Sequence, residues 1–175
     1  MTPMFIDAGF DGGNIEVLDA SVPGLARLAI RPDRFSHYYQ WFCFRISGAR
    51  GRECVLRIEN ASGAGYPAGW RNGYRAVASA DRETWRRVPT SYDGTVLEIR
   101  VTPEADCTWI AYFAPYTQEQ HDRFLGRTTA DPRVVHEVMG RSLDGRPLDL
   151  LRIATPGEGK RVAWVVARQH AGETM

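Results

Sequence analysis

A histidine and a glutamate, His170 and Glu173, lie three residues apart in the stretch RQHAGETM. An imidazole nitrogen and a carboxylate oxygen are both good zinc ligands, and a catalytic zinc typically has three protein ligands and one open position. A spacing of three on a helical turn or tight loop brings both side chains to one side, and Gly172 permits an unusual backbone angle between them. On these residues alone the pair is no more than a candidate part of a zinc site, because a lone histidine is more often structural than a ligand.

The segments before this pair would have to position it. Residues 162–167, VAWVVA, form a continuous apolar run, which is typical of a strand buried on both faces of an α/β sheet. Ligands of open α/β sheets bind just beyond the carboxyl ends of the strands, where the pair lies. Residues 148–153 predict another strand, and the turn-rich residues 155–160 join the two.

Two helices are predicted upstream of these strands. Thr117 and Gln120 have the spacing of a capping box, which predicts a helix to about Leu125. Asp131 followed by a proline predicts the start of a second helix that ends at Gly140. The apolar stripe of this second helix would comprise Val134, Val135, Val138 and Met139.

Residues 1–115 are typical of a β-rich domain. Short apolar or alternating runs predict strands at residues 14–18, 25–30, 38–46, 53–60, 73–80, 85–88, 96–101 and 108–114. In residues 38–46, Phe42, Phe44 and Ile46 fall on one face. Asp93-Gly94 lies where a hairpin turn would be. About eight strands separated by turns predict an antiparallel β-sandwich.

The predicted fold class is therefore α+β overall. An antiparallel β-sandwich occupies residues 1–115, a helical linker occupies residues 116–130, and residues 131–175 form the first helix and strands of an incomplete α/β domain, doubly wound. The length of 175 residues suits one full domain plus a fragment of another.

Composition excludes several classes of function. The net charge of +1 leaves no global field to hold nucleic acid or an anionic membrane. No apolar run approaches the ~20 residues that span a bilayer, and the N-terminus carries Asp7 without a basic region, unlike a signal peptide. The three cysteines (Cys43, Cys54, Cys107) have no metal-type spacing, which indicates reduced thiols in a cytoplasmic protein. The sequence contains no nucleophile elbow, dinucleotide fingerprint or P-loop, and it leaves the oligomeric state open.

Several segments, in order, resemble one enzyme family. The stretch ARQHAGETM resembles the A-R-x-H-P-G-E-[ST] signature of the M14 zinc carboxypeptidases, and most closely their cytosolic carboxypeptidase branch. Residues 69–104 and 109–125 resemble the β-sandwich domain that precedes the catalytic domain in that branch. Gly140-Arg141-Ser142 with Gly145-Arg146 resembles a G-R-S-x-x-G-R stretch of the catalytic domain. The resemblance covers the chain from about Tyr38 to Met175.

The resemblance implies a metallocarboxypeptidase that hydrolyses the C-terminal bond of a peptide or protein. His170 and Glu173 would be the first two ligands of one Zn²⁺. The third ligand, a general-base glutamate and an arginine for the substrate carboxylate would lie beyond Met175, so no catalytic residue is assigned within this sequence and the 175 residues alone are expected to be inactive. Ala171 replaces the usual proline, which removes a fixed φ angle but keeps both ligands.

A non-catalytic interaction module, binding protein or carbohydrate, is the alternative prediction. Trp70, in the glycine-rich residues 61–73, is the candidate for an exposed sugar-stacking ring, whereas Trp41, Trp109 and Trp164 are predicted in the core. His37, His121 and His136 have no partner at motif spacing and are predicted to be structural or solvent-facing. A local arginine cluster would suit acidic, glutamate-rich substrates, although scattered surface charge with nearby Asp and Glu is the simpler explanation. The cluster comprises Arg71, Arg75, Arg82, Arg86 and Arg87.

Overall fold

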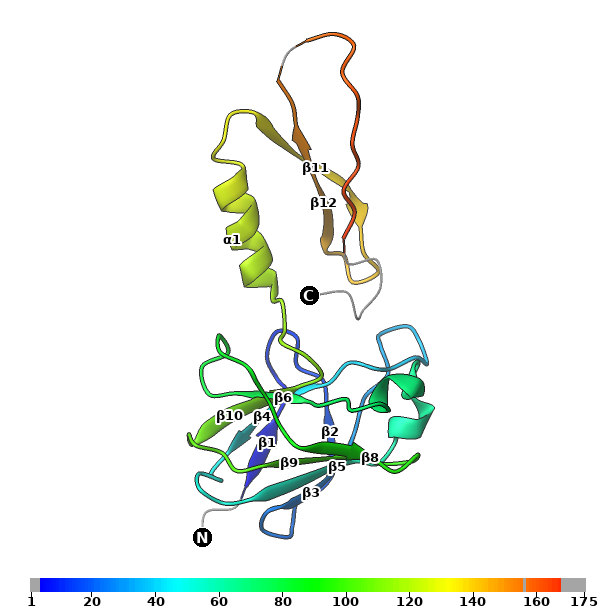
Figure 1. Cartoon of the computed structure of the whole chain (residues 1–175), viewed down its shortest axis with the longest axis vertical. Coiled ribbons are helices and arrows are strands. Elements are labelled where there is room, and N and C mark those ends of the chain that lie inside the picture. Colours follow the sequence, from blue (N-terminus) through cyan, green and yellow to red (C-terminus); the bar gives the residue numbers. More distant parts are fainter. Residues whose placement is uncertain (1–3, 156, 168–175) are drawn as a thin grey trace. The chain divides into compact units, whose positions relative to one another are not determined.

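The structure is a computed structural model that describes residues 4–155 and 157–167. The chain divides into two compact units, Met1–Pro115 and Tyr116–Met175, and Figure 1 shows both. The first unit is built mainly from strands, and the described part of the second contains one helix and a hairpin.

The described part of the first unit contains ten strands in two five-stranded sheets. One sheet has the order β1-β4-β10-β6-β7, and the other has the order β2-β3-β5-β9-β8. The two sheets stack face to face (Figure 1), which confirms the predicted sandwich. The strands are β1 (Phe5–Asp7), β2 (Glu16–Asp19), β3 (Leu25–Ala29), β4 (Cys43–Ser47), β5 (Cys54–Ile58), β6 (Val77–Ser79), β7 (Arg86–Arg87), β8 (Thr90–Tyr92), β9 (Leu97–Val101) and β10 (Cys107–Ala111).

One pairing departs from the predicted antiparallel arrangement. Strands β3 and β5 run parallel, with Ala26 opposite Leu56, whereas the other paired strands described in this unit are antiparallel. The chain leaves β3, crosses to the other sheet as β4 and returns as β5. This crossover brings β5 back in the direction of β3.

The sandwich core follows from period-two alternation in the strands. In β5 and β9 every second side chain is buried. Phe42, Phe44 and Ile46 are buried as predicted, on the face that contributes to this core. Burying a large apolar side chain contributes about 1.5–3 kcal/mol, so this core is the main source of stability in the first unit.

The hairpin between β8 and β9 has the predicted turn. The Asp93 carboxylate accepts the backbone N–H groups of Thr95 and Val96, both at 2.8 Å, and these bonds lower the pKa of Asp93. Gly94 adopts a φ of 103°, which a residue with a Cβ rarely adopts.

In the second unit, helix α1 (Gln118–Thr128) has the predicted capping box. The Thr117 hydroxyl accepts the Gln120 N–H, and the Gln120 side chain accepts the Thr117 N–H in return. The helix continues three residues past the predicted end at Leu125.

The predicted second helix is wrong. Residues from Val134 to Arg141 form strand β11 (Val134–Arg141), which pairs antiparallel with β12 (Pro147–Ile153) and has a bulge between Val138 and Gly140. Asp131 caps a turn, and the Val134 N–H donates to its carbonyl. Cross-strand pairing along the whole of β12 therefore determines this conformation, and the β-branched valines favour it.

None of the described residues of the second unit is buried, in contrast to the first unit. Residues 162–167, predicted as a buried strand, contain no strand in this structure, and Val165 is 93% exposed. A strand of this composition needs neighbours and cover on both faces, and the described hairpin supplies neither. Within the described ranges no helix combines the length and apolarity needed to cross a bilayer.

Candidate metal centre

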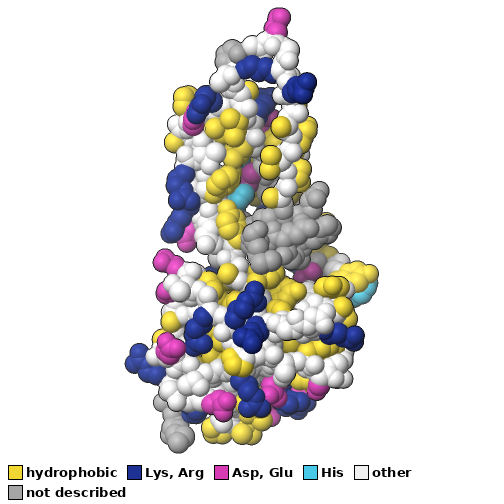
Figure 2. Space-filling view, in the orientation of Figure 1, with side chains coloured by type: hydrophobic (Ala, Val, Ile, Leu, Met, Phe, Trp, Pro, Cys, Tyr) yellow, Lys and Arg dark blue, Asp and Glu magenta, His cyan; other side chains and the backbone are white. Residues whose placement is uncertain are grey.

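The predicted zinc ligands, His170 and Glu173, lie outside the described residues, as does Ala171 between them. The last described segment before them, residues 161–167, is exposed throughout. Figure 2 shows hydrophobic side chains along the visible face of the second unit. The described helix and strands of this unit that precede the ligand pair are α1, β11 and β12.

A carboxylate whose side chain is largely enclosed joins these three elements. Asp149 lies on β12, and each of its carboxylate oxygens forms a hydrogen bond with a histidine. Its Oδ2 lies 2.8 Å from Nε2 of His121 on α1, and its Oδ1 lies 2.7 Å from Nε2 of His136 on β11. The Asp149 side chain is only 6% exposed. The hydrogen bond from His136, then that from His121, lowers the pKa of Asp149 against the opposing effect of burial. The carboxylate is therefore ionised at neutral pH and ties the helix to the hairpin.

This cluster does not form a metal site. The two imidazoles approach different oxygens of one carboxylate, and in the described ranges no group of three or more His, Cys, Asp or Glu side chains is arranged to hold a metal ion. His121 and His136 thus have structural bonds, as predicted. The sequence did not reveal their partner, because β12 places Asp149 beside them only through the hairpin register.

The arginines of the predicted cluster fall into two groups, those with a charged or aromatic partner and those that are exposed. Arg86 pairs with Glu104 at 3.3 Å, and the guanidinium carbon of Arg82 lies over the Phe10 ring, 5.2 Å from its centroid. Arg71, Arg75 and Arg87 are exposed. The Arg87 guanidinium donates to the Arg75 carbonyl at 3.2 Å, which places both residues side by side.

Trp70 is buried, so the predicted exposed sugar-stacking ring is wrong. Its side chain is 2% exposed, and its indole N–H donates to the Ala61 carbonyl at 2.9 Å. It packs edge-on against the rings of Tyr74 and Tyr112, with centroids 5.3 and 5.1 Å away. Short helical turns at Ala61–Gly63 and Pro67–Trp70 fold the glycine-rich loop over the core.

The other tryptophans also differ from the prediction. Trp41 and Trp109 are half-buried, and Trp164 is 72% exposed. Trp41 packs against Phe113 and donates its indole N–H to the Gly12 carbonyl at 2.7 Å. It belongs to a second apolar cluster around Cys43, separate from the main core.

The three cysteines are free, and Cys43 and Cys54 are buried. Burial raises the pKa of Cys43 to about 12. Burial also raises the pKa of Cys54, so Cys43 and Cys54 are protonated at neutral pH.

Comparison with known proteins assigns both parts of the chain. A family model described as the cytosolic carboxypeptidase N-terminal domain matches residues 6–113, and one described as zinc carboxypeptidase matches residues 122–175. An uncharacterised protein of Zymomonas mobilis is 43% identical over 97% of this chain and 43% of its own length. Human cytosolic carboxypeptidase 6 is 26% identical over 98% of this chain and 38% of its own length.

A solved structure agrees with these matches. The metallo-carboxypeptidase of Burkholderia cenocepacia is 45% identical, with a TM-score of 0.84 over 89% of this chain and 40% of that one. The chain thus spans about two fifths of the length of the relatives it matches. With a family model matching most of the sandwich and a second matching the segment that carries His170 and Glu173, the chain belongs to the cytosolic carboxypeptidases of the M14 zinc carboxypeptidase family.

Proposed function

We propose that this chain is part of a zinc-dependent carboxypeptidase that hydrolyses the C-terminal bond of a peptide or protein. The observation that carries the proposal is the ordered match to the family's N-terminal domain over residues 6–113 and to its zinc carboxypeptidase domain over residues 122–175. The proposed domains are a β-sandwich at residues 1–115, a helical linker at 116–130 and catalytic-domain residues at 131–175. The relatives named cytosolic carboxypeptidase support a cytoplasmic location.

We assign His170 and Glu173 as two ligands of one Zn²⁺. Their donor atoms, an imidazole nitrogen and a carboxylate oxygen, are those that catalytic zinc takes. Bound zinc would polarise the scissile carbonyl and activate water. No residue of this sequence is assigned as the general base or as the arginine that binds the substrate carboxylate, so we expect the 175 residues alone to be inactive.

An acidic substrate is the finer part of the proposal. The exposed guanidinium groups of Arg71, Arg75 and Arg87 have no described ion pair, in contrast to Arg86 with its Glu104. Unpaired surface cations attract acidic segments and mainly raise the association rate. We therefore expect glutamate-rich C-termini to be preferred over neutral ones, most strongly at low salt.

The test is release of the C-terminal amino acid from matched acidic and neutral peptides by the longer protein that contains this sequence. Activity should be lost on chelation, return with zinc and be absent in His170→Ala. The triple change of Arg71, Arg75 and Arg87 to Gln should reduce kcat/KM for the acidic peptide alone. Release that persists after chelation would overturn the proposed chemistry, and equal loss for both peptides would overturn the acidic preference.

The alternative of a non-catalytic interaction module keeps one supporting observation. All buried apolar residues of the described chain lie in the first unit, so the sandwich has its own complete core. A sandwich that binds a partner without zinc dependence, in a protein without peptidase activity, would favour this alternative.

A further inference from the structure

A small notch opens in the first unit where β6 separates from β10. Strand β6 pairs with β10 as far as Ser79 opposite Trp109, and the chain then turns away at Ala80 and Asp81, leaving Thr108 without a cross-strand neighbour from β6. The notch has a volume of about 170 Å³. This is close to the ~150 Å³ of cavities that hold a small organic molecule.

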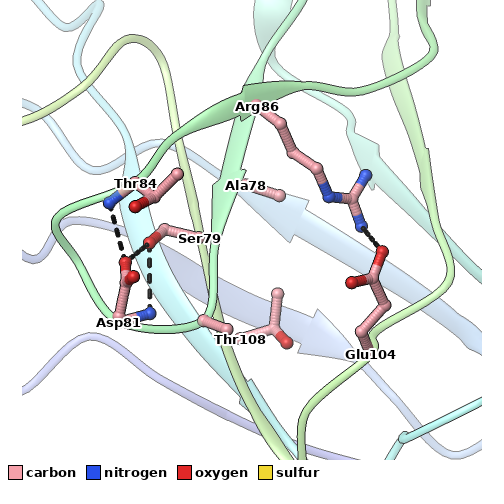
Figure 3. A pocket seen from close by; sticks show the side chains of 8 residues that line it. Ala78, Ser79, Asp81, Thr84, Arg86, Glu104 and Thr108 are labelled. Atoms are coloured by element: carbon pink, nitrogen blue, oxygen red, sulfur yellow. Dashed lines mark hydrogen bonds and ion pairs between the residues drawn. The ribbon is translucent and has the colours of Figure 1, made fainter.

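Figure 3 shows how charged groups border this notch. Asp81 and Thr84 lie on the loop at one side, the Arg86–Glu104 pair lies at the other, and Ala78 and Thr108 lie between them. A second hollow of about 310 Å³ lies beyond the same Arg86–Glu104 pair. The ion pair is therefore a ridge between two hollows and can be reached from both.

The Arg86–Glu104 pair can be opened at little cost. Its single close contact joins Nη2 and Oε1 at 3.3 Å, and the two side chains are 50% and 82% exposed. Exposed ion pairs of this kind contribute little to stability, because solvent screens them. Arg86 and Glu104 can therefore separate and bind a ligand instead, without unfolding the sandwich.

The Asp81 carboxylate, on the opposite wall, is fixed in its ionised form. Its Oδ1 accepts the Ser79 hydroxyl and the backbone N–H groups of Glu83 and Thr84, at 2.8 to 2.9 Å. The two backbone bonds, with the hydroxyl bond from Ser79, lower the pKa of Asp81 to about 2. The Thr84 side chain also hydrogen-bonds this carboxylate, so its negative charge is held at this wall of the notch.

The notch thus presents one cation, two carboxylates and a small apolar floor. A lone anion meets Asp81 and Glu104 as well as Arg86, and a lone cation meets Arg86. A compact molecule with both charges suits this arrangement, since its carboxylate can form two parallel hydrogen bonds to the guanidinium while its ammonium group binds Glu104 in the negative field of Asp81. The volume of about 170 Å³ suits a ligand with a short side chain.

We propose that this notch binds a small free amino acid, with the α-carboxylate on Arg86 and the α-ammonium on Glu104, on the side of the notch that faces the negative charge of Asp81. A free amino acid is what a carboxypeptidase releases, so a product-sensing role rests on the proposed function. Binding itself does not: the experiment below contains neither zinc nor peptide, and its failure would leave the proposed function untouched.

The experiment is saturation-transfer NMR with alanine on the 175-residue chain, which tolerates large or associated proteins because the ligand is observed. Acetate and methylammonium, each with one of the two charges, are titrated in parallel. The Kd of alanine is expected to be at least about tenfold lower than that of acetate or of methylammonium. Acetate binding as tightly as alanine would mean a simple anion site and would overturn the proposal.

Variants locate the binding. Arg86→Gln and Glu104→Gln should each weaken alanine binding about tenfold or more, and Ala80→Phe should block the notch without removing a charge. Arg27→Gln is the matched control, since Arg27 is also a half-exposed strand arginine paired with one glutamate, Glu59. Circular dichroism establishes that each variant is folded. No saturation transfer to alanine, or binding unchanged in both Arg86→Gln and Ala80→Phe, would refute the site.

Discussion

Substitution of Trp70 by alanine is expected to destabilise the sandwich rather than remove a binding surface. The side chain is 2% exposed and packs against Tyr74 and Tyr112. Truncating a buried tryptophan to alanine costs about 3–5 kcal/mol. The Ala61 carbonyl also loses its indole donor, and an unsatisfied buried acceptor costs about 1–3 kcal/mol, so the upper part of that range is expected. A loss of about 4–5 kcal/mol would lower the Tm by roughly 15–30 °C.

Thermal and urea unfolding followed by far-UV circular dichroism measure this effect. Trp164→Ala is the matched control, since it removes the same side chain at a position that is 72% exposed and should change stability by less than about 0.5 kcal/mol. Trp70→Phe keeps most of the ring and should cost about 1–3 kcal/mol through the lost hydrogen bond. A Trp70→Ala loss below about 1 kcal/mol, or equal effects at both positions, would refute the packing described here.

Three further predictions concern the rest of the chain. The pKa of Asp149 is lowered in the folded protein, so its contribution to holding α1 on the hairpin is present above the unfolded pKa of ~3.9 and is lost as the pH falls through the lower folded pKa. The hydrogen-exchange protection factors of α1, which correct for the intrinsic pH dependence of exchange, should fall in that acid range, and Asp149→Asn should remove the dependence. The 175-residue chain should self-associate in light scattering while residues 1–115 stay monomeric, because exposed apolar side chains such as Val162 and Val165 lie in the second unit; a monodisperse monomer of the whole chain would contradict this. Gly13→Ala should destabilise the sandwich by about 1–3 kcal/mol, since a Cβ there would lie 2.1 Å from the Ala8 carbonyl oxygen, whereas Gly126→Ala meets open space within α1 and should be neutral or stabilising in the same melts.

The sequence predicted those strands of the sandwich whose own residues alternate between apolar and polar. Phe42, Phe44 and Ile46 alternate with less apolar neighbours, and their burial follows directly. Strands β1 and β8 were missed because each has only three residues and exists through its partner. The parallel pairing of β3 with β5 depends on where the intervening chain crosses, which no local pattern encodes.

The errors in the second unit have a common physical cause. Val134, Val135, Val138 and Met139 fit a helical stripe, but their cross-strand partners in β12 make the segment a strand. Residues 162–167 have the composition of a buried strand, yet the described chain provides nothing to pair with or cover them. In both cases long-range contacts, rather than the local spacing of apolar residues, determine the conformation.

The candidate zinc site was predicted from a short motif and its likeness to a family, and its two residues stay a prediction. His121, His136 and Asp149 show what the sequence alone could not reveal, since they are far apart in the chain and meet only through the hairpin register. Trp70 shows the same limit, because a loop rich in glycine was taken as exposed, whereas its helical turns fold it over the core.

Zinc stoichiometry tests the central claim most directly. The longer protein that contains this sequence would be purified and its zinc measured by mass spectrometry, alongside His170→Ala, Glu173→Ala and the control His37→Ala, which changes an exposed histidine of the sandwich. We predict about one zinc per chain in the unmodified protein and in the control, with strong loss in both ligand variants. Full zinc occupancy in His170→Ala and Glu173→Ala would contradict the assignment of these two residues as ligands.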